Sequence, residues 1–143
     1  MNIYLDVDGV LIAKDSKLAN YANEFIKYIL ANYPNSTYWL TTRCQGDAGR
    51  PVQQIGHLFD EEALELLKTI KPTTWETITK AGAIDFTKPF LWFDDNLFIS
   101  DRQVLADNGV LDNWIPVDLR KDPDMLKRFI EDFPLPINLN ETI

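Results

Sequence analysis

The chain has 143 residues, of which 45% are hydrophobic and 25% charged, the composition of an ordinary globular protein of one domain. A net charge of −8 argues against wide contact with nucleic-acid backbones or anionic lipids, and the longest apolar run is too short to cross a bilayer. The single cysteine, Cys44, and a start unlike a signal peptide predict a cytoplasmic protein that binds no membrane.

Four short apolar runs predict the strands of a mostly parallel sheet. The first begins the stretch 3–11, and the others lie at 37–42, 89–93 and 114–117. The run at 89–93 is continuously apolar, which is typical of a strand covered on both faces. Strand, helix and strand follow one another at the start of the chain, which predicts a βαβ unit with parallel strands.

Helices are predicted between the strands from capping residues and apolar stripes. They are expected to start at Asp15 or Ser16, at Asp60, at Thr73, near Ser100 and at Asp122. Residues 43–57 contain three glycines and show no periodicity, so we expect a long loop there. An irregular tail is expected beyond residue 136. The fold class is therefore α/β, a single Rossmann-like domain with helices on both faces of the sheet.

Two acidic pairs follow predicted strands. Asp6 and Asp8 end the first strand and precede a glycine, and Asp94 and Asp95 end the third. A buried strand avoids ionised groups unless a metal or hydrogen bonds compensate them. Ligands of parallel sheets bind beyond the carboxyl ends of the strands, where both pairs should meet. The alternative for the first pair is a plain turn, because Asp-Gly is common in turns.

The order of these residues resembles the four motifs of the haloacid-dehalogenase-like (HAD) superfamily. The matching segments are Asp6-Val7-Asp8-Gly9-Val10, the strand ending in Thr41, Lys71-Pro72 and Asp94-Asp95, so the resemblance covers about residues 3–95. It implies a Rossmann-like, HAD-like fold and Mg²⁺-dependent phosphatase chemistry. Family members that cleave carbon–halogen bonds lack an acid two residues after the nucleophile, so Asp8 favours phosphate chemistry.

The resemblance assigns a role to each matching side chain. Asp6 would be the nucleophile that forms an aspartyl-phosphate, and Asp8 would protonate the leaving oxygen and then activate water. Thr41 would donate a hydrogen bond to a phosphoryl oxygen. Lys71 would neutralise charge on the nucleophile and the phosphoryl group.

The cofactor implied by the resemblance is Mg²⁺. Its ligands would be Asp94, Asp95, the Asp6 carboxylate and the backbone carbonyl of Asp8, an oxygen-rich set of the kind that Mg²⁺ prefers. Either member of the Asp94–Asp95 pair can be the main ligand, with the other supporting it.

Two lysines compete for the third motif. Lys71 lies at the start of a predicted helix whose N-terminus should adjoin the site, because that helix runs antiparallel to the third strand. Lys80 lies nine residues further along, about 13 Å away at 1.5 Å per residue. We therefore favour Lys71, with a solvated surface lysine as the alternative reading.

No gap between motifs is long enough for a cap domain, so the chain resembles a capless member. An open site of that kind suits a large phosphorylated substrate, unless a partner subunit closes it. Arg43 follows the hydroxyl pair and is a candidate for binding a substrate anion, with Thr42 supporting the same loop. A surface ion pair is the alternative for Arg43.

Two other functions compete with a phosphatase. The first is a non-catalytic regulatory module in which the carboxylates hold Mg²⁺ and phosphate without turnover. The second is a phosphatase that processes nucleic-acid ends, which suits an open site but is opposed by the acidic charge.

Overall fold

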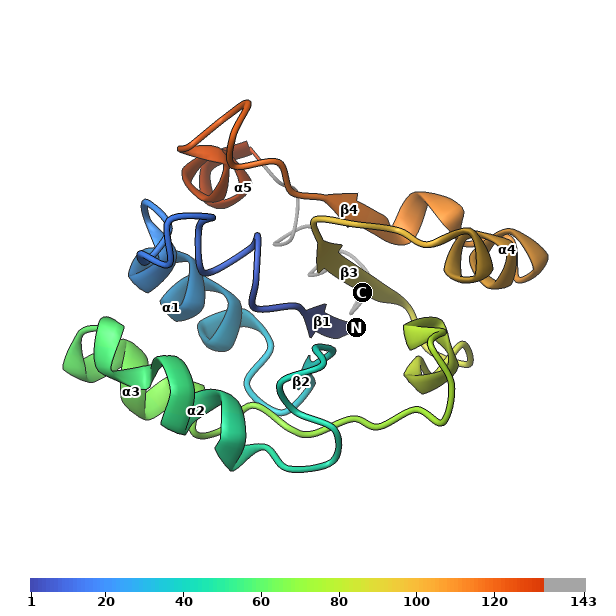
Figure 1. The fold of residues 1–143 in the computed structure, drawn as a ribbon, viewed down its shortest axis with the longest axis horizontal. Coiled ribbons are helices and arrows are strands. Elements are labelled where there is room, and N and C mark those ends of the chain that lie inside the picture. Colours follow the sequence, from blue (N-terminus) through green and yellow to red (C-terminus); the bar gives the residue numbers. More distant parts are fainter. Residues whose placement is uncertain (133–143) are drawn as a thin grey trace, which may run out of the picture.

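A four-stranded parallel sheet forms the centre of the protein (Figure 1). The structure is a computed structural model that describes residues 1–132. The strands are β1 (Asn2–Leu5), β2 (Thr37–Trp39), β3 (Phe90–Asp94) and β4 (Trp114–Pro116), in the spatial order β2-β1-β3-β4. Each neighbouring pair is parallel. All four predicted strands are therefore confirmed, and the expected tail beyond residue 136 lies outside the described residues.

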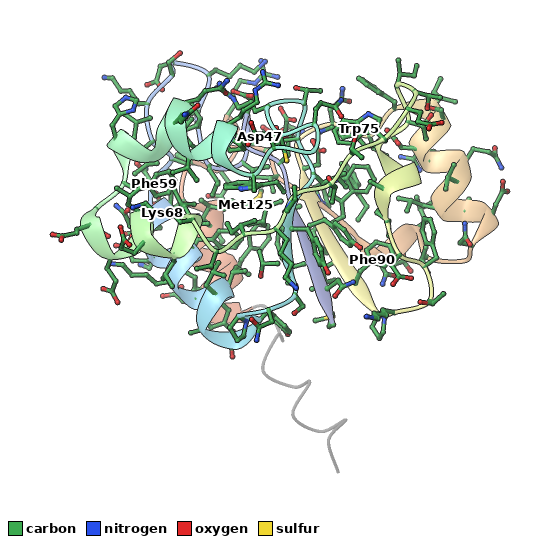
Figure 2. All side chains as sticks on the ribbon, turned by 90° about the horizontal axis from the view of Figure 1, so that it is seen from below. Asp47, Phe59, Lys68, Trp75, Phe90 and Met125 are labelled. Atoms are coloured by element: carbon green, nitrogen blue, oxygen red, sulfur yellow. The ribbon has the colours of Figure 1, made fainter. Side chains whose placement is uncertain are left out.

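Both faces of the sheet are covered. Alternate residues of β1 point to opposite sides, so that Ile3 and Leu5 belong to one hydrophobic cluster and Tyr4 to another. Figure 2 shows the same division, with Phe59 on one side of the strands and Phe90 on the other. Strands buried on two faces have to be apolar throughout, which explains the uninterrupted apolar runs in the sequence.

Helices and short 3₁₀ turns provide these two covers. The first cluster takes side chains from α1 (Ala22–Asn32), α2 (Gly49–Ile55), α3 (Glu61–Leu67) and α5 (Met125–Asp132), and the turn η1 (Gly56–Leu58) packs beside α2. The second takes them from α4 (Ile99–Asp107) and the turns η2 (Lys80–Ala83) and η3 (Leu111–Asn113). The architecture is α/β with helices on both faces of an all-parallel sheet, compatible with a single Rossmann-like domain. In residues 1–132, no helix has the length and apolar character needed to cross a membrane.

The start of α3 follows its sequence signal and the start of α1 does not. Asp60 caps α3 by accepting a hydrogen bond from the backbone N–H of Ala63. The first helix was expected from Asp15 or Ser16, but α1 begins at Ala22. Residues 11–19 instead fold back on themselves through three backbone hydrogen bonds, which leaves these groups unavailable to a helix.

Two further expectations are wrong, and both concern connections. Residues 43–57 contain α2 and part of η1 where a loop was expected. The helix expected from Thr73 is absent, since the chain stays extended after α3 and hydrogen-bonds along β2. Lys71 donates its backbone N–H to Thr37 and accepts one from Trp39, and the Thr73 hydroxyl bonds to the Trp39 carbonyl instead of capping a helix.

Candidate active site

The carboxyl ends of β1 and β3 bring the two acidic pairs together. Leu5 pairs with Phe93 in the sheet, and the backbone N–H of Asp6 donates to the Phe93 carbonyl at 3.0 Å. Asp6 therefore leaves β1 directly beside Asp94, the last residue of β3. Because β1 and β3 are neighbouring parallel strands, both end at the same edge of the sheet, and residues far apart in the sequence lie together there.

Three carboxylates form a compact cluster at this edge. One oxygen each of Asp6, Asp94 and Asp95 lies within 4.8 Å of the other two. Asp6 and Asp94 are buried, whereas Asp95 is exposed. The cluster thus has a buried floor and one ligand open to solvent, which is an arrangement that can hold a cation and a second molecule.

Gly9 makes room for Asp95. Its backbone has a φ of +82°, and a Cβ atom at this position would lie 2.2 Å from the Asp95 carboxylate oxygen Oδ2. Any larger residue would therefore displace Asp95 as well as strain the backbone. The glycine of the first motif is required by the close approach of two chain segments.

Lys80 is the lysine that contacts the cluster. Its Nζ lies 2.8 Å from Asp94 Oδ2 and 3.3 Å from Asp6 Oδ2. Lys71, which was favoured from the sequence, is exposed, and its Nζ lies 5.7 Å from the centre of the Tyr38 ring. Lys71 was expected at the start of a helix that does not form, because the 71–79 segment between α3 and η2 contains no helix.

A buried aspartate on α4 holds the turn that carries Lys80. Asp101 is 1% exposed and accepts a hydrogen bond of 2.9 Å from the backbone N–H of Ala81. The Thr79 hydroxyl adds a second link by donating to Ser100 at 3.0 Å. Asp101 was not singled out in the sequence, since a lone aspartate in a helix has no signal that separates it from a surface residue.

The buried cluster contains more negative than positive charge. Burial raises the pKa of Asp94 to about 8, with repulsion from Asp6 as the second cause. Burial alone would lower the pKa of Lys80, but attraction to Asp6 and Asp94 outweighs it and leaves the pKa above its usual value. With a pKa of about 8, Asp94 holds a proton at neutral pH in the metal-free protein, and a bound cation would displace that proton.

Asp8 does not belong to the cluster of three carboxylates and pairs with Arg43. Arg43 donates from Nε and Nη2 to the two Asp8 oxygens, each at 2.9 Å, and from Nη1 to the Gln54 side chain at 2.8 Å. Hydrogen bonding to Arg43 is the main cause that lowers the pKa of Asp8. The ion pair considered for Arg43 from the sequence is therefore present, with Asp8 as its partner. Gln54 of α2 also binds Arg43, a contact that the sequence does not predict.

The two threonines after β2 differ in their surroundings. Thr41 is fully buried, and its Oγ1 accepts the backbone N–H of Arg43 at 3.3 Å, so that its hydroxyl proton is left for another acceptor. Thr42 is exposed in the same turn. Of these two residues, Thr41 is the one held in a fixed position next to β1.

The donor set fits Mg²⁺. The cluster offers carboxylate oxygens only, which are hard ligands of the kind that Mg²⁺ prefers. Each oxygen of Asp6 and Asp94 that accepts a hydrogen bond retains a second lone pair. The side chains that would hold the ion are those of Asp6, Asp94 and Asp95. The backbone carbonyl of Asp8 stays a prediction as a fourth ligand, since Arg43 contacts only the Asp8 carboxylate.

Neither a family model, nor a curated protein, nor a solved structure matches this chain.

Proposed function

We propose that the protein is a Mg²⁺-dependent phosphatase of the HAD-like type without a cap domain, which acts through an aspartyl-phosphate on Asp6. One observation carries the proposal: the Lys80 ammonium lies within 3.3 Å of Asp6 and 2.8 Å of Asp94, beside Asp95. A nucleophilic carboxylate, a buried cation and a set of metal ligands are thus within reach of one phosphoryl group, and phosphoryl transfer depends mainly on such positioning and charge neutralisation.

In the first half-reaction, an Asp6 oxygen attacks phosphorus and the bond from phosphorus to the ester oxygen breaks. Asp8, once released from Arg43 and protonated, gives its proton to the leaving oxygen, and Lys80 and the Thr41 hydroxyl stabilise the charge on the phosphoryl oxygens. In the second half-reaction, water attacks the aspartyl-phosphate and gives a proton to Asp8. Phosphate leaves and the Asp6 carboxylate is restored.

Mg²⁺ bound by Asp6, Asp94 and Asp95 would neutralise phosphoryl charge and the surplus charge of the cluster. The chain itself supplies the rest of the site. Burial limits the contact of Asp6 and Asp94 with solvent, and Gly9 lets Asp95 reach the cluster.

A regulatory module that binds Mg²⁺ and phosphate without turnover is the second candidate. It is favoured by the bidentate contact between Arg43 and Asp8, which occupies both oxygens of the residue proposed as the acid. Catalysis requires this pair to open when substrate binds, and a binding module does not.

Hydrolysis of an aryl phosphate separates the two candidates. The wild type should turn over with Mg²⁺ and lose activity in EDTA, and Asp6→Asn should be inactive while Asp112→Asn, a change on the exposed η3 turn, behaves as wild type. Acid-quenched wild type should carry phosphate on Asp6. Phosphate and Mg²⁺ binding with no turnover of aryl or alkyl phosphates would instead support the regulatory module.

A further inference from the structure

Two hollows adjoin the carboxylate cluster. The first has a volume of about 440 Å³ and is lined by Asp8, Arg43 and Gln54 together with apolar residues of α2 and η1. The second has a volume of about 310 Å³ and lies against Asn96 and the segment 117–120 that follows β4. Both hollows are lined by Gly9, Ala13, Lys14 and Asp95, so they meet beside the carboxylate cluster.

The position of Asp8 indicates where the ester group of a substrate would lie. Asp8 lines the first hollow and not the second, and an acid has to contact the leaving oxygen. The alcohol portion would therefore begin beside Asp8. From there it can follow the shared floor, past Gly9 and Lys14, into the second hollow.

Two cations face this path without a carboxylate partner. Lys14 and Arg120 are exposed, and within residues 1–132 neither forms an ion pair. Besides Asp95, the acid that lines the second hollow is Asp118, whose Oδ1 accepts the backbone N–H groups of Arg120 and Lys121 at 3.2 Å each. Its charge is thus partly compensated by the loop, and the Arg120 side chain stays available.

The two unpaired cations stand out against an overall charge of −8. An anionic substrate is repelled by most of such a surface, so cations beside the reaction centre are where it gains attraction. Lys80 and a bound Mg²⁺ would compensate the charge of the phosphoryl group. Lys14 and Arg120 therefore supply more positive charge than one phosphate group requires.

We propose that Lys14 and Arg120 form a subsite for a second anionic group, so that the substrate is a phosphomonoester whose alcohol carries a further carboxylate or phosphate. This inference rests on the proposed function for the identity of the first group. It also replaces the expectation of a large substrate with that of a small one, since the two hollows together have room for a metabolite.

Binding of two matched phosphonates tests the subsite without requiring turnover. The probes are 3-phosphonopropionate and propylphosphonate, measured by calorimetry with Mg²⁺. Wild type should bind the carboxylate-bearing probe about tenfold more tightly, and Lys14→Ala or Arg120→Ala should reduce this preference to about threefold or less. Lys121→Ala removes the same charge one residue away and lines neither hollow, so it should keep the wild-type preference.

Equal affinity of wild type for both probes, failure to bind either, or an equal loss in Lys121→Ala would overturn the subsite. Turnover of phenyl phosphate, measured in parallel, tests the proposed function separately. A preference for the carboxylate-bearing probe without turnover of any phosphoester would overturn the phosphatase and support the anion subsite. Phenyl phosphate turnover should be unchanged in Lys121→Ala, because Lys121 lines neither hollow.

Discussion

Replacement of Lys80 by methionine is the most direct test of the site, because it separates the contact seen in the structure from the lysine favoured by the sequence. The side chain is 14% exposed and lies between two buried carboxylates. At an effective dielectric constant of about 20, its attraction to each carboxylate at 2.8 and 3.3 Å amounts to about 5–6 kcal/mol. Most of this attraction is offset by the cost of burying the charges.

The net loss of stability is smaller than either attraction. Removing one partner of a buried ion pair costs about 3–5 kcal/mol. Asp94 can take up a proton at little cost near neutral pH, since burial already raises its pKa to about 8. We therefore expect Lys80→Met to lose about 3 kcal/mol at pH 7, a fall in melting temperature of roughly 10 °C. Mg²⁺ should restore part of this loss by replacing the missing positive charge.

The effect on turnover should exceed the effect on folding. Loss of a positioned cation at the phosphoryl group should lower kcat for an aryl phosphate by about 10²-fold or more. Lys71→Met is the matched control, because it removes the same charge from an exposed side chain near the Tyr38 ring. It should change stability by less than about 1 kcal/mol and leave kcat unchanged. Inactivity of Lys71→Met with normal kcat in Lys80→Met would refute the assignment.

Three further outcomes follow from the same geometry. Gly9→Ala should weaken Mg²⁺ binding at least tenfold by displacing Asp95. The control is Gly109→Ala: Gly109 also has a positive φ but has open space around it, so this variant should lose stability and keep its Mg²⁺ affinity. Equal Mg²⁺ affinities of the two variants, measured by calorimetry, would contradict the role of Gly9. Because the pKa of Asp94 in the folded state is raised to about 8, the metal-free protein should lose stability as pH rises towards 8. Mg²⁺ affinity should increase about tenfold per pH unit up to pH 8 and then level off, since binding displaces the Asp94 proton. A Mg²⁺ affinity that stays constant from about pH 6 to 9 would count against this prediction. Asp101→Asn should lower kcat with little change in Mg²⁺ affinity, because it loosens the turn that carries the lysine; kcat at the wild-type level in a folded variant would show that the anchor is dispensable.

The strands and the acidic edge could be predicted from the sequence because local pattern determines them. An apolar run buried on both faces is visible in the residues 89–93 themselves, and parallel strands have to end at one edge of the sheet. The cap of α3 at Asp60 is equally local, since one side chain bonds to a backbone group three residues away. These features need no knowledge of the rest of the chain.

The lysine could not be predicted by the same means. Thr73 and Glu76 have the spacing of a helix cap, but long-range hydrogen bonds to β2 hold this segment extended. Such bonds join residues more than thirty positions apart, so a local pattern does not show them. The role of Asp101 and the link from Arg43 to Gln54 were missed because each contact joins two elements of the fold, 20 and 11 positions apart in the sequence, and no local pattern shows it.

The extended segment after α3 has a consequence for the association of this chain with itself. Lys71 forms two backbone hydrogen bonds with the outer side of β2, which is the last strand on that side of the sheet. On the opposite side, β4 spans only Trp114–Pro116, and Pro116 has no N–H to donate. Unpaired strand edges invite pairing with other chains, and short strands, lysine and proline are common protections. The segment at 71–73 therefore limits sheet extension through β2 and lowers the risk of edge-to-edge aggregation.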